Sequence, residues 1–335
     1  MKKFFIYVCI LFFIVFMLPI VFTKKRQAKS IENINQNAEE NIEVENYPKY
    51  DYKKYATIKL YHSKTGEVEE LPIDEYLYGV VSAEMPANFE MEALKAQAVV
   101  ARTYTLYQIL NGNSKHGEAD LCDDYSCCQA WITKDERFAK WDENEAQNNW
   151  NKIVNAVNST QGKIITYEGK PIDAFFHSNS GGITETASNV WGGQNFPYLK
   201  SVETAGEDEY TQYNSEVEIT KEDLINKIRE KHQEIEINYD EVDSIKILEF
   251  TESGRVKTIK LGNVQIAGTE LRSLLGLKST NFNYEIRENS IMFFVKGYGH
   301  GVGMSQTGAD SLAKNGASFE EIIKHFYSGV EIVDL

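Results

Sequence analysis

The chain has little positive charge for its length, and this excludes one broad class of function. It carries 35 lysines and arginines against 50 acidic residues, a net charge of -15 over 335 residues. Five of the positive charges lie within the first 26 residues, so the remainder is near -20. An acidic body argues against nucleic acid as a partner and against a protein that lies flat on anionic lipid.

Several common catalytic motifs are also absent. The chain has no Gly-x-Ser-x-Gly elbow of serine hydrolases, no His-Glu-x-x-His of zinc proteases and no Gly-Lys-Ser/Thr phosphate loop. It also has no internal repeat. The sequence therefore gives no support to these three classes or to a repeat architecture.

A long apolar run lies at the N-terminus. Residues 4–22 carry no charge, and nineteen residues at the helical rise span roughly 28 Å, close to a hydrocarbon core. A cleaved signal peptide is the alternative, but no small-residue cleavage pattern ends the run. We predict a membrane anchor with flanking charges over 1–26, a flexible polar linker over 27–54 and a folded body over 55–335. The flanking charges do not fix the orientation.

The folded body mixes helical and strand patterns without strict β-α-β alternation, which predicts an α+β fold. We expect a hairpin over 56–73, with Lys64 to Glu67 in its turn. Asn88 is the expected cap of a helix over 89–110, and Ser318 to Glu321 forms a capping box. Further helices are expected at 74–81, 145–160, 220–231 and after 303, and strands at 163–168, 171–177, 243–251, 255–261 and 290–296.

The first candidate for chemistry is Glu84, within Ser-Ala-Glu-Met-Pro at the junction of two expected helices. Burial among small and apolar neighbours would raise its pKa and keep it protonated near neutral pH, as a general acid requires. The alternative is an acid that caps the next helix. Arg102 lies further along that helix, where it would orient a carboxylate, bind a sugar hydroxyl or simply be solvated.

A second candidate is a cluster of metal-ligating residue types. His116, Cys122, Cys127 and Cys128 form a complete set for tetrahedral zinc, with no open position for catalysis. The alternative is one disulfide and a spare thiol, which an extracellular location permits. The spacing leaves both open. Cys9 lies inside the apolar run and is expected to be inert.

Two glycine-rich segments, 176–182 and 297–306, are the remaining candidates. Glycine lets the backbone approach a ligand closely, and His177, His300 and Gln306 offer hydrogen bonds to a substrate. The alternative is a pair of tight structural loops.

Taken together, these motifs resemble the stage II sporulation protein D family. The resemblance covers roughly 56–330, in chain order. It includes Ser82–Pro86, Lys95–Tyr104, Phe176–Gly182, Pro197–Lys200 and Gly299–Gln306, the last followed by Gly308 and Ala309.

The resemblance implies a single-pass cell-membrane protein with a catalytic ectodomain on the extracytoplasmic side. It implies a lytic transglycosylase of engulfment during sporulation, which cuts between N-acetylmuramic acid and N-acetylglucosamine in peptide-stripped glycan strands. It also implies two partners, the amidase stage II sporulation protein P and sporulation protein M. The family's catalytic acid matches Glu84, its groove residues match Arg102, Tyr198 and Lys200, and the His/Cys cluster resembles a structural zinc site.

Two other functions remain open. A non-catalytic, glycan-binding enhancer of a cell-wall amidase would bind strands without cutting them. A hydrolytic muramidase would give reducing ends and would need a second carboxylate near Glu84.

Overall fold

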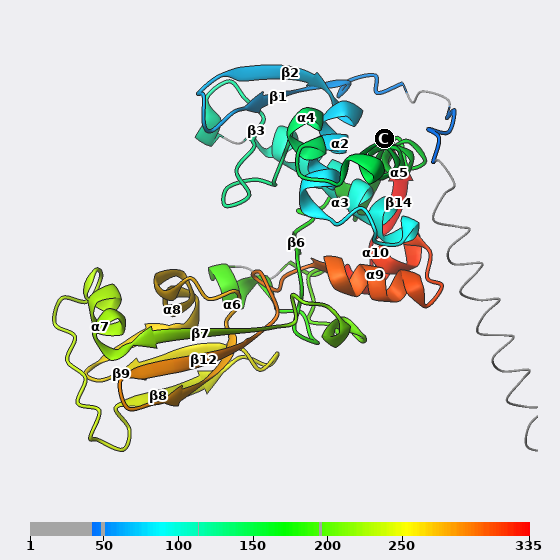
Figure 1. Ribbon diagram of the computed structural model, residues 1–335. Coiled ribbons are helices and arrows are strands. Elements are labelled where there is room, and N and C mark those ends of the chain that lie inside the picture. The colour runs from blue at the N-terminus through cyan, green and yellow to red at the C-terminus, as the bar shows by residue number, and fades with distance from the viewer. Residues whose placement is uncertain (1–41, 48–50, 113, 194–195) are drawn as a thin grey trace, which may run out of the picture. The chain divides into compact units, whose positions relative to one another are not determined.

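Figure 1 shows the computed structural model, which describes residues 42–47, 51–112, 114–193 and 196–335. The predicted anchor over 1–26 lies outside the described residues. Among the residues that are described, no helix is long and apolar enough to cross a membrane. The chain divides into Met1–Glu43 and Val44–Leu335, and the second unit is the subject below.

The second unit combines helices with antiparallel and small mixed sheets, which confirms the α+β prediction. Its helices are α2 (Ile73–Glu84), α3 (Met91–Asn111), α4 (Lys134–Phe138), α5 (Glu143–Asn158), α6 (Ala187–Trp191), α7 (Lys221–Arg229), α8 (Gly268–Leu275), α9 (Gln306–Lys314), α10 (Phe319–Phe326) and the 3-10 turns η1 (Ser114–His116) and η2 (Glu207–Glu209). Its strands are β1 (Thr57–Tyr61), β2 (Val68–Pro72), β3 (Leu121–Cys122), β4 (Lys163–Tyr167), β5 (Lys170–Pro171), β6 (Phe176–His177), β7 (Asn214–Thr220), β8 (Ile245–Phe250), β9 (Val256–Leu261), β10 (Val264–Ala267), β11 (Asn281–Ile286), β12 (Ser290–Lys296), β13 (Met304–Ser305) and β14 (Glu331–Asp334).

The first hydrophobic core surrounds α3, which packs against α2, α5, α9, α10 and β4. The helix is buried on nearly all of its surface over its first four turns, because every residue from Ala93 to Leu106 is buried except Lys95. Alanines on several faces let the neighbouring elements approach closely. The predicted cap Asn88 is wrong, since the helix begins at Met91 with Glu90 at the cap position.

The small sheets around this core hold its loops in place. The predicted hairpin is confirmed: β1 pairs antiparallel with β2, from Thr57 opposite Pro72 to Tyr61 opposite Val68. Strand β3 adds to the other edge of β1 in parallel, with Cys122 opposite Tyr61. Strands β14, β4 and β5 form a second sheet, and β6 pairs in parallel with β13.

The second core lies between the sheets β11-β12-β7 and β10-β9-β8 and the helices α7 and α8. Thr220 caps α7 as expected, because its hydroxyl accepts a hydrogen bond from the Asp223 amide. Strand β12 lies in the middle of its sheet, and Ile291, Phe293 and Val295 on one of its faces are buried in this core.

Part of the predicted linker packs against the folded body. Tyr52 is 7% exposed, and its hydroxyl donates to Asp74 at 2.8 Å and accepts from the Gly162 amide at 3.1 Å. The Glu45 amide donates to the Asn155 side chain at 2.8 Å. Polar composition alone suggested a free tether, but these residues bond to the ends of α2 and α5.

Candidate active site

Glu84 is the last residue of α2, where the chain turns out of the helix. Met85 adopts an extended conformation, as the residue before a proline favours, and its side chain is 1% exposed. The buried Met85 anchors the turn, so that the Glu84 side chain is directed from a fixed helix end.

Both carboxylate oxygens of Glu84 are held by donors from distant segments. The Ala130 amide donates to Oε1 at 2.7 Å, and the Gln306 side chain donates to Oε2 at 3.1 Å. Burial raises the pKa of this carboxyl above its ordinary value, and the two hydrogen bonds oppose part of that rise. Glu84 is therefore a fixed acid that retains its proton to a higher pH than a solvated glutamate.

Glu84 faces a cleft of about 440 Å³. Its lining comprises residues 83–88, Arg137, Trp141, Glu145, Asn149 and Gln212. This volume lies within the range of about 300–1,000 Å³ that is usual for small-ligand sites. Glu145 is thus a second carboxylate in the cleft; it is exposed in the first turn of α5, where the helix dipole also favours an acid.

The segment that holds Glu84 Oε1 runs directly from the cysteine loop. Gln129 is 1% exposed, and its side-chain amide donates to Tyr76 on α2 at 2.8 Å and to Thr105 on α3 at 3.1 Å. These bonds fix the backbone immediately before Ala130. Ala130, whose amide binds Glu84, follows Cys128 by only two residues in the sequence.

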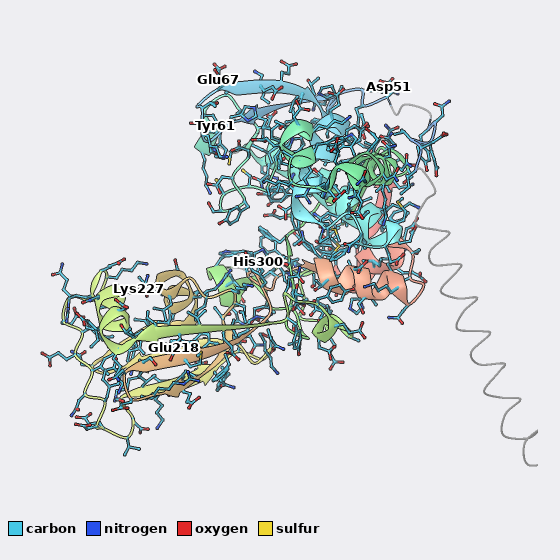
Figure 2. The ribbon with its side chains drawn as sticks, in the orientation of Figure 1. Asp51, Tyr61, Glu67, Glu218, Lys227 and His300 are labelled. Carbon is cyan, nitrogen blue, oxygen red and sulfur yellow. The ribbon has the colours of Figure 1, made fainter. Side chains whose placement is uncertain are left out.

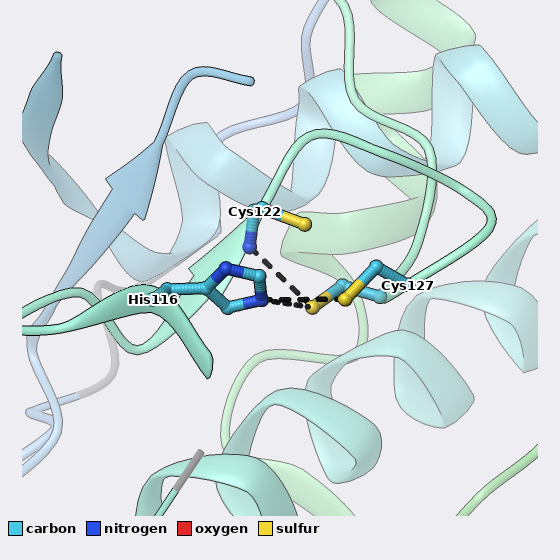
Figure 3. Close-up of side chains that lie close together, drawn as sticks. His116, Cys122 and Cys127 are labelled. Carbon is cyan, nitrogen blue, oxygen red and sulfur yellow. Dashed lines mark hydrogen bonds between the residues drawn. The ribbon is translucent and has the colours of Figure 1, made fainter. Parts of the chain in front are cut away.

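The four predicted metal-ligating residues are brought together. Their ligand atoms all lie within 4.8 Å of one another, and all three cysteines are free thiols. The Nε2 atom of His116 lies 3.4 Å from Sγ of Cys127 and 3.4 Å from Sγ of Cys128. Figure 3 shows His116 and Cys127 pointing toward each other. Tetrahedral bonds of zinc to nitrogen and sulfur place such ligand atoms roughly 3.5 Å apart. The donor set and its spacing therefore fit a metal ion, and the disulfide alternative does not describe this structure.

Neighbouring elements hold this cluster in position. The His116 ring stacks on Tyr61, with ring centroids 5.9 Å apart, and Figure 2 shows Tyr61 on the hairpin. The backbone amide of Cys122, on β3, donates to Cys128 Sγ at 3.5 Å.

Gln306, which holds the other oxygen of Glu84, begins α9 next to a buried acid. That acid is Glu207, 1% exposed, which was not singled out from the sequence. Its two oxygens accept from six donors: the amides of Ser180 and Gly182 and the hydroxyls of Ser180, Thr204, Ser305 and Thr307. Glu207 thus ties the segment 178–182 to the start of α9, which explains why two serine- and glycine-rich segments meet there.

The two predicted histidines lie beside each other and outside the lining of the cleft; His177 is buried and His300 is half-buried. His177 is 4% exposed, and its Nδ1 donates to the Val302 carbonyl at 3.1 Å. His300, labelled in Figure 2, accepts from the Val302 amide at 3.0 Å. Burial lowers the pKa of His177 to about 3 and lowers that of His300 as well, so both rings are neutral. Their hydrogen bonds to Val302 hold the glycine-rich loop, and their substrate-binding roles remain predictions.

The placement of Arg102 does not support its predicted role in the substrate groove. Its side chain is 0% exposed and donates to the carbonyls of Val157, Thr160 and Lys163. It also lies 3.6 Å from the Asp74 carboxylate. A guanidinium with five donors suits this task of holding a helix end against α3.

Tyr198 and Lys200 also lie outside the lining of the cleft. Tyr198 is 6% exposed, and its hydroxyl accepts from the Asp173 amide at 3.1 Å. Lys200 is exposed. Their substrate-binding roles remain predictions.

Arg137 and Trp141 were missed from the sequence although they line the cleft with Glu84. The available signal was their spacing of four, which would place two large side chains on one face if a helix continued through both. Such a pair is common on surfaces, so the spacing alone did not distinguish it.

Two family models and several known proteins match this chain. A family model described as stage II sporulation protein matches residues 61–167, which include Glu84 and the His/Cys cluster, and a domain of unknown function matches 202–303. The chain is 37% and 35% identical, over 278 residues, to stage II sporulation protein D of Bacillus amyloliquefaciens and of Bacillus subtilis; each match covers 82% of this chain and 78% of the relative. It is 28% identical over 305 residues to the amidase enhancer of Bacillus subtilis, covering 76% of this chain and 40% of that protein. The chain therefore belongs to the stage II sporulation protein D family.

Proposed function

We propose that this protein is a peptidoglycan lytic transglycosylase that cuts between N-acetylmuramic acid and N-acetylglucosamine in peptide-stripped strands during engulfment. One observation carries the proposal: Glu84 is a fixed, partly exposed acid with a raised pKa in a cleft of suitable volume. A protonated carboxyl so placed is suited to general acid catalysis.

The reaction proceeds in two proton transfers through the same group. Glu84 donates its proton to the glycosidic oxygen as the bond to the anomeric carbon of muramic acid breaks. The carboxylate then accepts the proton of the 6-hydroxyl of that sugar as its oxygen bonds to the anomeric carbon. The product end is a 1,6-anhydro ring, and no water is consumed. Because the nucleophile already belongs to the substrate, proximity supplies much of the rate advantage.

The hydrogen bonds on Glu84 suit both stages. The Ala130 amide can only donate, so it stabilises the carboxylate form and fixes the orientation of Oε1. The amide of Gln306 donates to Oε2, which is the more adaptable contact because a side chain can move with the proton.

The test compares Glu84→Gln with Glu145→Gln in the full-length chain on peptide-free glycan strands. Glu84→Gln should fold and bind strands but produce no anhydro ends, whereas Glu145→Gln should still produce them. Activity in Glu84→Gln removes Glu84 from the mechanism. If the unmutated chain produces reducing ends and Glu145→Gln abolishes cutting, the result supports a hydrolase that uses two carboxylates.

The similarity to an amidase enhancer supports a second candidate, a module that binds strands and positions them for an amidase. In that case the full-length chain should co-sediment with strands and leave them intact. A stimulated amidase in the same mixture would then identify the role.

We also propose a structural zinc ion at His116, Cys122, Cys127 and Cys128, which together supply the nitrogen and sulfur ligands that zinc prefers. The predicted anchor over 1–26, the extracytoplasmic location of the folded body, and the amidase and sporulation protein M as partners belong to the same proposal. Equilibrium dialysis followed by elemental analysis tests the metal.

A further inference from the structure

The cleft contains a cation, Arg137, that forms no ion pair with any carboxylate of the described residues. Its Nε–H is buried and has no acceptor among the described residues. Glu145 lines the same cleft but does not pair with it. A half-buried guanidinium that lacks an anion carries a desolvation cost that a bound anion would offset.

Arg137 is held in position rather than free to leave the cleft. It lies on α4, whose start is fixed by a capping box between Thr133 and Glu136. Its guanidinium carbon lies 4.7 Å from the centroid of the Trp141 ring, a cation-π arrangement that orients the planar fork. Burial lowers the pKa of Arg137, but an arginine remains charged at neutral pH.

Peptide-free strands supply a suitable anion. Muramic acid carries a lactyl group whose carboxyl is joined by an amide bond to the peptide. When that amide is hydrolysed, every muramic acid gains a free carboxylate beside the sugar ring. Guanidinium and carboxylate form charge-assisted, often bidentate, hydrogen bonds, whereas an intact amide offers only a neutral carbonyl.

We propose that Arg137, oriented by Trp141, binds the free lactyl carboxylate of muramic acid and thereby selects strands from which the peptide has been removed. This inference rests on the proposed function, because it assumes that the cleft at Glu84 receives a muramic acid residue. Arg137 acts as a specificity residue in it, and the proton transfers remain with Glu84.

The experiment measures binding, so that its failure is distinct from failure of the catalytic proposal. Full-length chain carrying Glu84→Gln is mixed with peptide-free strands whose lactyl carboxylates are free, or with the same strands after coupling to methylamine. The charge-assisted contact predicts binding to the free carboxylates roughly tenfold tighter or more. Adding Arg137→Gln should abolish this preference, and Arg137→Lys should retain part of it. Arg229→Gln removes the same charge from the exposed end of α7 and should leave the preference intact.

Two results would overturn the inference, and a third concerns the catalytic proposal alone. If the Glu84→Gln chain binds the free and the amidated strands equally well, the inference is refuted before any variant of Arg137 is made. A preference that survives Arg137→Gln in a chain of unchanged melting temperature also overturns it. Wild-type chain that fails to cut strands refutes the catalytic proposal, while the carboxylate preference is still measured.

Discussion

Replacement of Glu207 by glutamine should weaken the whole loop assembly beneath the candidate active site. The change keeps size and shape but converts one carboxylate oxygen into an amide NH2. One oxygen accepts from the Ser180 amide and the other from the Gly182 amide, each at 3.0 Å. Whichever way the glutamine turns, its NH2 therefore faces a backbone donor that cannot rotate.

The magnitude follows from these contacts. The hydroxyls around Glu207 can turn to accept from an amide, but the facing backbone N–H loses its acceptor or shares a weaker one. A buried donor left without its partner costs about 1–3 kcal/mol, and the lost charge weakens the remaining bonds. We therefore expect Glu207→Gln to lower the free energy of unfolding by about 2–3 kcal/mol.

Urea denaturation measures this effect, with Glu209→Gln as the matched control. Glu209 lies two residues away in the same turn and is exposed, so its loss should cost less than about 0.5 kcal/mol. Glycan cutting should fall as well, since Glu207 fixes the start of α9 from which Gln306 reaches Glu84. If Glu207→Gln is as stable as its control, the hydrogen-bond reasoning is wrong.

Three further predictions follow from other residues. Burial raises the pKa of Asp173 from 3.8 to about 7, so the free energy of unfolding of the wild type should fall by up to about 4 kcal/mol as the pH rises from 4 to 7. Asp173→Asn should remove this loss in urea titrations at pH 5 and 8, and equal pH profiles of the two chains would contradict the prediction. Removal of a bound metal by a chelator, or Cys127→Ser, should lower the melting temperature and also reduce glycan cutting, because Gln129 and Ala130 connect the cysteine loop to Glu84. Unchanged cutting by the metal-free chain would contradict this connection. Tyr52→Phe removes the hydrogen bonds to Asp74 and Gly162 and should cost about 1 kcal/mol in the same urea assay, whereas a truly free linker predicts no change.

Local signals predicted the elements well where a cap or a turn supplied a mechanism. The capping box of Ser318 and Glu321 is present at α10, and the Lys64–Glu67 turn connects β1 and β2. The cap at Asn88 failed because the chain enters α3 through tertiary contacts, such as the Glu90 amide bonded to Asp310. Strand β7 was missed because its mostly polar sequence acquires its register only from β12.

The candidate site was predictable in its residue types but not in its geometry. Small and apolar neighbours indicated that Glu84 is buried, yet its two partners come from 46 and 222 residues away in the chain. Helical spacing could not show that Arg102 points into the core, since Thr160 and Lys163 approach it only in the folded chain. Arg137 stands out only once the cleft and the absence of a described ion pair are seen together.

The most direct test of the central claim is the mass of the products that the full-length chain makes from peptide-free glycan strands. The account predicts new ends lighter than reducing ends by one water, and none when Glu84 is replaced by glutamine. New ends of full mass, or lighter ends that persist without Glu84, would contradict it.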